Sequence, residues 1–201
     1  MKALPNPLTA LVLLAGMGLA STAEAALMSR LGGLAVYDTD LNITWLANAN
    51  ANGTMNWTAA NAWAAGLNVG GYTGWRLPTA LNADGSGPCG PDYNCINSEL
   101  GHLFYTEGGL TQGQSITSSA VLSNLFSNMQ TFIYWSGTEY APNPNSAWYF
   151  STINGVQNYG NKDNNRYAWA VRSGDVPEPG VMGLLGIGAL AWAGTRHKRR
   201  G

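Results

Sequence analysis

The sequence predicts a single α+β domain that lies between two export segments. Apolar runs near its start predict a hairpin, an alanine-rich stretch with helical spacing predicts a helix, and aromatic runs from residue 132 onward predict an antiparallel sheet. The helical and strand-like stretches are segregated along the chain and do not alternate regularly. This order favours an α+β domain over one built from βαβ units.

The first predicted elements are a hairpin and a helix. Residues 34–38 and 43–46 read as short strands separated by the turn-forming sequence Thr-Asp-Leu-Asn. Asn56 is placed to cap the next helix, because an asparagine side chain accepts a hydrogen bond from the first helical turn. Apolar residues at i, i+3, i+4 and i+7 would form one face of this helix: Ala60, Trp63, Ala64 and Leu67.

The later elements are shorter and more polar at their ends. A polar insertion at residues 82–97 precedes short helices that we expect at 98–105 and within 118–129. From residue 132 onward the pattern of apolar residues changes from helical to strand-like. Aromatic runs bounded by Asn, Gly and Pro follow, and these are typical of strands. Three such strands are expected: 132–136, 147–151 and 167–172. The tryptophans within and before them are expected in the core: Trp75, Trp135, Trp148 and Trp169.

The N-terminal segment has the order of a secretory signal. Lys2 is followed by the apolar stretch 8–19 and then by Ala-Glu-Ala at residues 23–25. This apolar run is too short to span a bilayer comfortably, whereas signal peptides have this charged, apolar and small-residue order. Residues 1–25 are therefore predicted to be a signal peptide that is cleaved after Ala25.

The C-terminal segment, residues 176–201, predicts a marginal membrane helix. The uncharged stretch 180–195 has 16 residues, about 24 Å of helix against a hydrocarbon core of about 30 Å. A basic cluster follows it and would stay on the cytoplasmic side, so that the domain faces outward. The cluster consists of Arg196, Lys198, Arg199 and Arg200.

This tail resembles the PEP-CTERM sorting signal of Gram-negative bacteria that produce exopolysaccharide. The resemblance is carried by Pro177, Glu178 and Pro179, then a glycine-containing apolar helix, then the terminal basic cluster. It implies an exosortase as processing partner and at least transient anchoring in the inner membrane. The alternative is an ordinary single-pass tail anchor.

The charge of residues 26–175 excludes one class of partner. This span holds five basic and nine acidic side chains, a net charge of 5 − 9 = −4. Binding to a phosphate backbone needs a clustered positive surface. Nucleic acid is therefore not an expected partner. The span is long enough for one domain with its own core.

The two cysteines predict a local disulfide. Cys89 and Cys95 stand in the short sequence Cys-Gly-Pro-Asp-Tyr-Asn-Cys, and an exported protein folds in an oxidising compartment. A metal site would need more ligands than the neighbouring sequence offers. A bond that closes so small a loop stiffens the loop more than the domain.

A second resemblance covers most of the domain. The chain is similar to the Lcl C-terminal domain family, also called DUF1566, through an ordered series of motifs. These are residues 37–38, 44–46, Trp57, the sequence Gly-Trp-Arg-Leu-Pro-Thr at 74–79, 99–100, 134–138, 147–150 and 171–172. The resemblance implies a single domain with a fold related to C-type lectins and to formylglycine-generating enzymes. Relatives carry two cysteines where this chain has residues such as Ala64 and Ser173.

The sequence offers no recognisable catalytic set. His102 is the single histidine between residues 26 and 175 and is interpreted as a structural or surface residue. The cysteine pair does not match the late copper-binding pair of formylglycine-generating enzymes. Neither a Gly-x-Ser-x-Gly motif nor a His-Glu-x-x-His motif is present. We therefore predict a non-enzymatic protein without a cofactor.

Calcium is an alternative for one loop. Asn82, Asp84 and Ser86 alternate as oxygen ligands do, and Gly87 follows. The twelfth position, which is acidic in an EF-hand, would be Tyr93. A solvated glycine-rich turn is therefore the preferred interpretation of this loop.

The loops between the late strands are the predicted binding site. Loops at 139–145 and 158–166 supply aromatic, amide and carboxylate side chains, which suit the hydroxyls and ring faces of sugars. The candidate ligand-binding residues are Tyr140, Asn143, Asn145, Tyr159, Asp163 and Asn165. Asparagine-rich turns also form without any ligand, and this alternative stays open.

These observations lead to one functional hypothesis and two alternatives. The leading hypothesis is a lectin-like module at the cell surface or in the extracellular matrix that binds polysaccharide. The first alternative is a structural or adhesive matrix protein whose partners are surface proteins. The second is an enzyme of the formylglycine-generating type.

Overall fold

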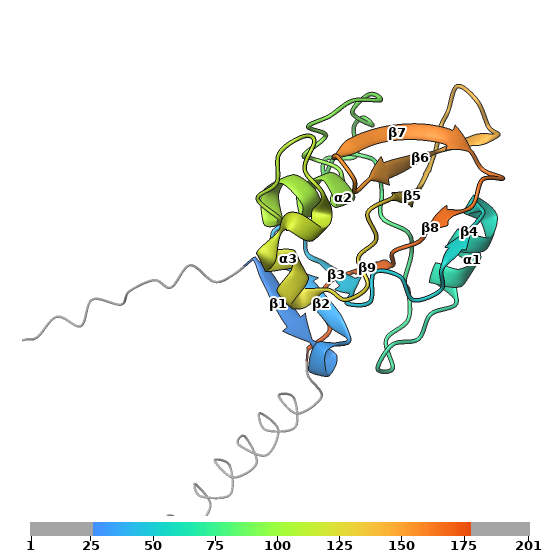
Figure 1. Cartoon of the computed structure of the whole chain (residues 1–201). Helices are drawn as coiled ribbons and strands as arrows, with labels where there is room; N and C mark the ends of the chain where they lie inside the picture. The colour runs from blue at the N-terminus through green and yellow to red at the C-terminus, as the bar shows by residue number, and fades with distance from the viewer. Residues whose placement is uncertain (1–25, 178–201) are drawn as a thin grey trace, which may run out of the picture.

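The computed structural model describes residues 26–177, and the elements of this part confirm a mixed α+β arrangement (Figure 1). In chain order they are β1 (Leu27–Arg30), the 3-10 turn η1 (Leu31–Gly33), β2 (Ala35–Asp38), β3 (Ile43–Leu46), β4 (Thr54–Met55), α1 (Trp57–Ala65), α2 (Glu99–Gly101), the π-helical turn η2 (His102–Glu107), η3 (Ile116–Ser118), α3 (Ala120–Leu125), β5 (Ile133–Glu139), β6 (Ser146–Ser151), β7 (Val156–Asn161), β8 (Arg166–Tyr167) and β9 (Val171–Ser173).

The strands form two sheets. The smaller sheet has the order β1-β2-β3-β9, and the larger has the order β4-β8-β5-β6-β7. The predicted hairpin is confirmed as β2 and β3, with Asp38 paired to Ile43 next to the turn. All described pairs are antiparallel except β5 with β8, which is parallel.

The predicted strand at 167–172 is wrong as a single element. Its first part is β8 of the larger sheet, and its last part is β9, which pairs with β3 of the smaller sheet. The buried residues between them, Ala168, Trp169 and Ala170, cross from one sheet to the other. A continuous run of apolar and aromatic residues does not reveal such a crossing, because its period does not change where the chain passes from one sheet to the other.

The predicted loop at 158–166 is also wrong in its first half. Residues 158–161 belong to β7, which pairs with β6 over its whole length and places Tyr159 opposite Trp148. The sequence Val-Gln-Asn-Tyr-Gly-Asn has few apolar residues, so it lacks the alternation that marks a strand. Backbone pairing with β6 decides its conformation.

The helices lie where they were predicted, but their lengths differ from the prediction. Asn56 caps α1 by accepting a hydrogen bond from the Ala59 N–H, and Ala60 and Ala64 are the buried residues of this helix. The helix ends at Ala65, before Leu67. The helix expected at 98–105 is a single α turn that continues as the π-helical turn η2 to Glu107.

Aromatic side chains fill the space between the two sheets. The predicted core tryptophans are confirmed, since all of them are buried: Trp75, Trp135, Trp148 and Trp169. Trp169 packs edge-on against Trp45, with ring centroids 5.4 Å apart, and donates from its indole N–H to the carbonyl of Leu46. The core of the described chain extends from Leu27 to Val176, so residues 26–177 contain a core of their own.

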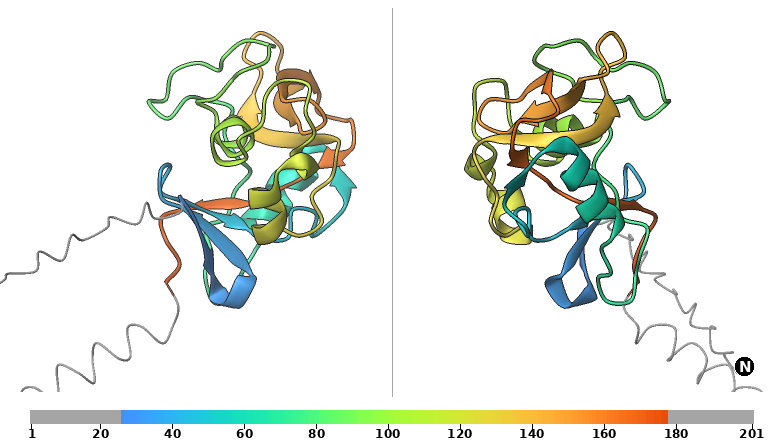
Figure 2. Two further views of the ribbon diagram at one scale, coloured as in Figure 1. Left: turned by 60° about the vertical axis from the view of Figure 1, so that its left-hand side comes forward. Right: turned by 90° about the vertical axis from the view of Figure 1, so that its right-hand side faces the viewer.

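Both ends of the described chain lie on the side of the smaller sheet. Figures 1 and 2 show β1 and the residues after β9 together on this side, whereas the hairpin of β6 and β7 lies at the opposite end. Arg30 of β1 forms an ion pair with Asp175, which confirms that the two ends are neighbours. The late loops therefore point away from the exit of the chain.

Arg76 and Glu99 link the segment before the insertion to α2. The guanidinium donates two hydrogen bonds to the two oxygens of Glu99, at 2.7 and 2.6 Å, and Glu99 also accepts from the backbone N–H of Thr79. The Glu99 carboxylate, in turn, raises the pKa of Arg76.

Replacing Glu99 by Gln should destabilise the domain by about 1.5–3 kcal/mol, the usual contribution of charge-assisted hydrogen bonds. Part of the effect is screened, because the Arg76 side chain is 40% exposed. Urea unfolding of residues 26–177, followed by tryptophan fluorescence, measures the loss. The control is Glu139→Gln in the ion pair with Lys162, where the 57% exposed carboxylate should contribute less than about 1 kcal/mol. Equal losses in the two variants would contradict the assigned role of Glu99.

Candidate functional site

A stacked pair of tyrosines joins the loop between β5 and β6, which holds Tyr140, to β7, which holds Tyr159. The rings of Tyr140 and Tyr159 are parallel within 5°, with centroids 3.7 Å apart. The ring of Trp148 meets both of them edge-on, at 5.6 and 5.7 Å. Because Trp148 is buried and Tyr159 is 36% exposed, the pair is an aromatic surface supported from below.

The turns beside this pair are tied together. The backbone N–H of Lys162 donates to the carbonyl of Asn145, and the Lys162 ammonium donates to the carbonyl of Pro144 at 2.7 Å. Asn143 closes its own turn, because its side-chain oxygen accepts from the backbone N–H of Asn145. The two predicted binding loops are therefore held side by side.

The six predicted binding residues differ in what their side chains do. Tyr140 and Tyr159 stack, and Asn143 has a structural hydrogen bond. Within residues 26–177, no hydrogen bond engages the exposed side chains of Asn145, Asp163 or Asn165. Asn165 directly precedes β8 and makes no ring or hydrogen-bond contact with the tyrosines. The structure thus brings Tyr140, Tyr159, Asn143 and Asn145 together and leaves Asn165 apart.

Arg166 is a feature of this region that sequence reasoning missed. Its guanidinium lies over the rings of Trp135 and Tyr149, at 4.7 and 4.2 Å from their centroids. Burial lowers the pKa of Arg166, and among the described residues no carboxylate pairs with it. The sequence shows an arginine at the start of an aromatic run. However, the two rings that its guanidinium contacts, Trp135 and Tyr149, belong to β5 and β6 and are distant in the sequence.

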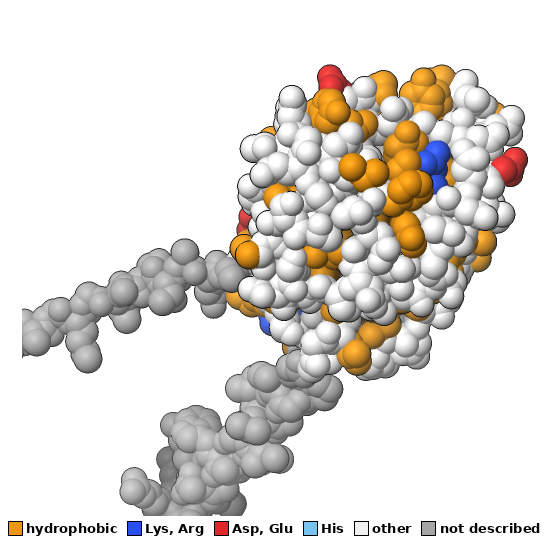
Figure 3. Space-filling view, in the orientation of Figure 1, with side chains coloured by type: hydrophobic (Ala, Val, Ile, Leu, Met, Phe, Trp, Pro, Cys, Tyr) orange, Lys and Arg blue, Asp and Glu red, His pale blue; other side chains and the backbone are white. Residues whose placement is uncertain are grey.

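The surface near these strands has few charges. Figure 3 shows hydrophobic side chains gathered in stripes among uncharged polar groups, with isolated basic and acidic side chains between them. This face lacks the basic cluster that nucleic-acid binding requires. It offers apolar and hydrogen-bonding groups instead.

The insertion is closed by the predicted disulfide. Cys89 and Cys95 are bonded, and the buried side chain of Gln157 donates to the carbonyl of Cys89. In the loop of the calcium alternative, Asp84 Oδ1 accepts two hydrogen bonds from Ser86, which lower the pKa of Asp84. The Asn82 amide nitrogen donates to the Ser86 hydroxyl, whereas Asn82 Oδ1 has no hydrogen-bond partner. This segment is therefore built as a turn held by its own side chains.

A cleft of about 420 Å³ lies between the smaller sheet and the insertion. Amide side chains of Asn42, Asn82 and Asn97 line it, together with the Arg76–Glu99 pair. Both oxygens of Glu99 already accept hydrogen bonds from Arg76 and Thr79, so the Arg76–Glu99 pair forms part of the wall of the cleft and is not needed to bind a ligand. The three amides give the cleft donors and acceptors suited to a small hydroxylated group.

His102 has acidic neighbours that the sequence did not reveal. Its Nε2 lies 3.1 Å from Glu107 Oε1 and 4.0 Å from Asp38 Oδ1. Asp38, His102 and Glu107 are close enough to share a metal ion. The interpretation of His102 as a structural or surface residue therefore omitted its carboxylate partners, which lie at the end of β2 and at the end of η2.

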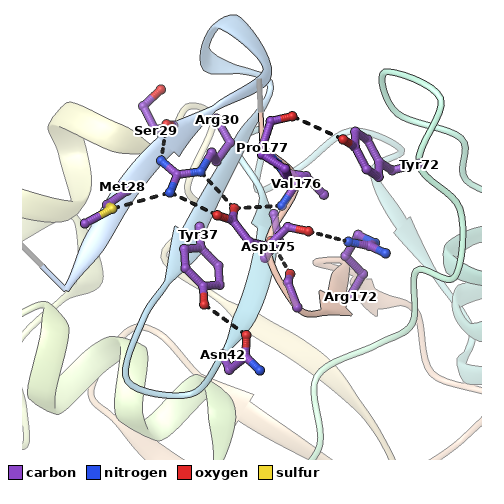
Figure 4. Close-up of polar contacts among 12 residues, drawn as sticks. Met28, Ser29, Arg30, Tyr37, Asn42, Tyr72, Arg172, Asp175, Val176 and Pro177 are labelled. Carbon is purple, nitrogen blue, oxygen red and sulfur yellow. Dashed lines mark hydrogen bonds and ion pairs between the residues drawn. The ribbon is translucent and has the colours of Figure 1, made fainter. Parts of the chain in front are cut away.

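The segment before the C-terminal tail is fastened to the domain (Figure 4). The side chain of Asp175 accepts from Arg30, and its backbone carbonyl accepts from Arg172. Val176 is completely buried, and the Tyr72 hydroxyl donates to the carbonyl of Pro177 at 3.1 Å. The folded part therefore continues to the first proline of the predicted sorting motif.

The remaining predicted sorting residues lie outside the described part of the chain. They are Glu178, Pro179, Arg196, Lys198, Arg199 and Arg200. The predicted signal peptide and the apolar stretch 180–195 also lie outside it. Among residues 26–177, the helices are all too short or too polar to cross a membrane.

Comparison with protein families now identifies the domain. The model of the Lcl C-terminal domain matches residues 34–172. The chain belongs to the Lcl C-terminal domain family. A second model, the PEP-CTERM protein-sorting motif, matches residues 175–200. No curated protein matches the chain.

The sorting motif carries information about destination. It implies processing by an exosortase and export to the cell envelope of a Gram-negative bacterium. The Lcl C-terminal domain ends at residue 172, and the sorting motif begins at residue 175. Asp175, Val176 and Pro177 are thus the first residues of the sorting motif, and they are held against the domain.

Replacing Val176 by Ala should destabilise residues 26–177 by about 2 kcal/mol, because it removes buried methyl groups and leaves a cavity. Urea unfolding measures this loss. The control is Val121→Ala, since Val121 is 53% exposed on α3 and its truncation should change stability little. A chain that ends at Asp175 should lose a similar amount, and an unchanged midpoint would show that Val176 does not support the domain.

Proposed function

We propose that this Lcl C-terminal domain is a non-enzymatic, C-type-lectin-like module that binds polysaccharide at the cell surface. The observation that carries the proposal is the stacked pair of Tyr140 and Tyr159, in which Tyr159 is 36% exposed. The turns that hold Asn145 and Asp163 follow the strands and loops of this pair in the chain, and a backbone hydrogen bond from Lys162 to Asn145 joins them. Sugar rings pack their C–H faces on such aromatic surfaces. Their hydroxyls hydrogen-bond to neighbouring amides and carboxylates.

The rigidity of the site supports this role. Trp148 holds the tyrosine pair from below, and Lys162 joins the two neighbouring turns. A surface whose side chains are already fixed loses little conformational entropy on binding. Asn145 and Asp163 then supply hydrogen-bonding groups at its edge without breaking bonds within the domain.

The position of the site relative to the chain ends also supports it. The hairpin of β6 and β7 lies at the end opposite to both ends of the described chain, near residues 26 and 177 (Figures 1 and 2). A domain held near a membrane through residues after Pro177 would present this hairpin outward. Display toward an extracellular polysaccharide or biofilm matrix follows from this orientation.

The other segments complete the proposal. Residues 1–25 act as a signal peptide that is removed on export, and the tail at 176–201 anchors the protein in the inner membrane until the exosortase acts. The mature protein then belongs to the cell surface or the extracellular matrix. The domain needs no cofactor for sugar binding in this scheme.

Binding of residues 26–177 to a glycan array that includes the exopolysaccharide of the producing bacterium tests the proposal. Tyr159→Ala should weaken binding at least about tenfold, equivalent to about 1.4 kcal/mol, because it removes the exposed ring. Asn145→Ala and Asp163→Ala should weaken it less. Calcium and a chelator are compared in separate arms.

The matched control is Tyr93→Ala in the insertion, since Tyr93 is 37% exposed and Tyr159 is 36% exposed. It should leave glycan binding unchanged. If the folded domain binds no glycan, or if Tyr93→Ala weakens binding as much as Tyr159→Ala, the proposed site is wrong. Capture of a surface protein that polysaccharide does not displace would favour a protein-binding matrix component instead.

A further inference from the structure

A buried group of acidic side chains surrounds His102 at the junction of the smaller sheet and the helices. Asp38 ends β2, Asp40 lies in the turn after it, and His102 and Glu107 are the first and last residues of η2. His102 Nε2 is 3.1 Å from Glu107, 4.0 Å from Asp38 and 4.0 Å from Asp40. Four side chains that could bind a cation therefore converge from two separate elements.

The π-helical form of η2 produces part of this arrangement. In a π-helix the repeating hydrogen bond spans five residues, so side chains at i and i+5 lie one above the other. His102 and Glu107 have this spacing and are in hydrogen-bond contact. In a regular α-helix, residues five apart point in different directions, and this pair would be separated.

The environment of the carboxylates indicates that a charge is missing. Asp38 is completely buried, and its Oδ2 has no hydrogen-bond partner, whereas Oδ1 accepts from the N–H groups of Asp40 and Leu41. Trp45 Nε1 is also buried without a hydrogen-bond partner. An orphaned, buried carboxylate oxygen is costly unless another group satisfies it.

The three carboxylates of the group share one basic neighbour, the imidazole of His102. Within residues 26–177, no lysine or arginine forms an ion pair with Asp38, Asp40 or Glu107. A dication would neutralise two carboxylates and accept a neutral imidazole.

We propose that Asp38, His102 and Glu107 bind a divalent transition-metal ion, of the zinc or manganese class, with Asp40 completing the site on its solvent side. The ligand atoms of the three residues lie within 4.8 Å of one another. Two ligands at about 2.1 Å from a tetrahedral metal are about 3.4 Å apart, so small side-chain movements bring the group onto an ion. One imidazole with carboxylates suits these metals, whereas calcium takes oxygen ligands.

The bound ion would fasten the turn after β2 to η2. These two elements are far apart in sequence, and the metal joins them through side chains that the fold has already brought together. Ligands that bind only the folded state raise its stability. The site is therefore structural, and it is separate from the stacked pair of Tyr140 and Tyr159.

Titration of metal-free residues 26–177, without an affinity tag, with zinc chloride or manganese chloride tests the site by calorimetry. We expect one ion per chain and a higher midpoint of thermal unfolding in its presence. His102→Gln and Glu107→Gln should each weaken binding at least about 100-fold, because loss of outer-shell partners alone costs 10-fold to 100-fold. The control Glu139→Gln alters a carboxylate outside the group and should bind metal as the unaltered chain does.

The imidazole resonances of His102 provide a readout that does not depend on stability. His102 is the single histidine of residues 26–177, and the two cysteines are in a disulfide, so neither another imidazole nor a thiol competes. Zinc should shift the ring nitrogen signals of His102 at a ratio of one ion per chain. Each variant is first shown to be folded by its near-ultraviolet circular dichroism.

Several outcomes would overturn the proposal. They are absence of zinc and manganese binding by the folded chain, binding that persists in both variants, and binding of calcium alone without a change at His102. In each of these cases the group would be a hydrogen-bonded network of histidine and carboxylates. Glycan binding is measured on a different surface, so its success or failure does not bear on this result.

Discussion

The structure depends on the buried segment that carries the chain from the larger sheet to the smaller one. Trp169 lies at its centre, donates a hydrogen bond to Leu46, and packs against the rings of Trp45, Phe126 and Tyr134. Each sheet is too small to bury its own apolar face, and this segment gives them one shared core. Substituting the tryptophan would leave a large cavity at the point where both sheets meet.

This shared core fixes two ends with different tasks. On the side of the smaller sheet, Arg30 and Tyr72 fasten the chain as far as Pro177, immediately before the rest of the sorting motif. At the opposite end, Tyr159 of β7 stacks on Tyr140 of the loop between β5 and β6. Because the shared core holds the two ends in a fixed relation, the orientation of the chain at Pro177 also sets the orientation of the proposed binding surface.

Charge is scarce in this domain, so the few charged groups at its interior are informative. Glu99 is fully satisfied by Arg76 and a backbone N–H, and it stabilises the wall of a cleft. Asp38 is equally buried but keeps an oxygen without a partner, beside His102. The contrast between these two carboxylates distinguishes a completed ion pair from the group that we propose to bind a cation.

The sequence by itself determined the features that depend on neighbours along the chain. These include the β2–β3 hairpin, the Asn56 cap of α1, the local disulfide and the two family motifs, because periodicity, capping and spacing are local properties. Tertiary structure alone decided that β7 is a strand, that the last apolar run serves two sheets, and that Tyr159 stacks on Tyr140. It also brought Asp38 to His102, which is remote in sequence. Such long-range pairings are set by backbone hydrogen bonds and by the shared core. They produce no periodic pattern of apolar residues, so the sequence does not show which segments pair.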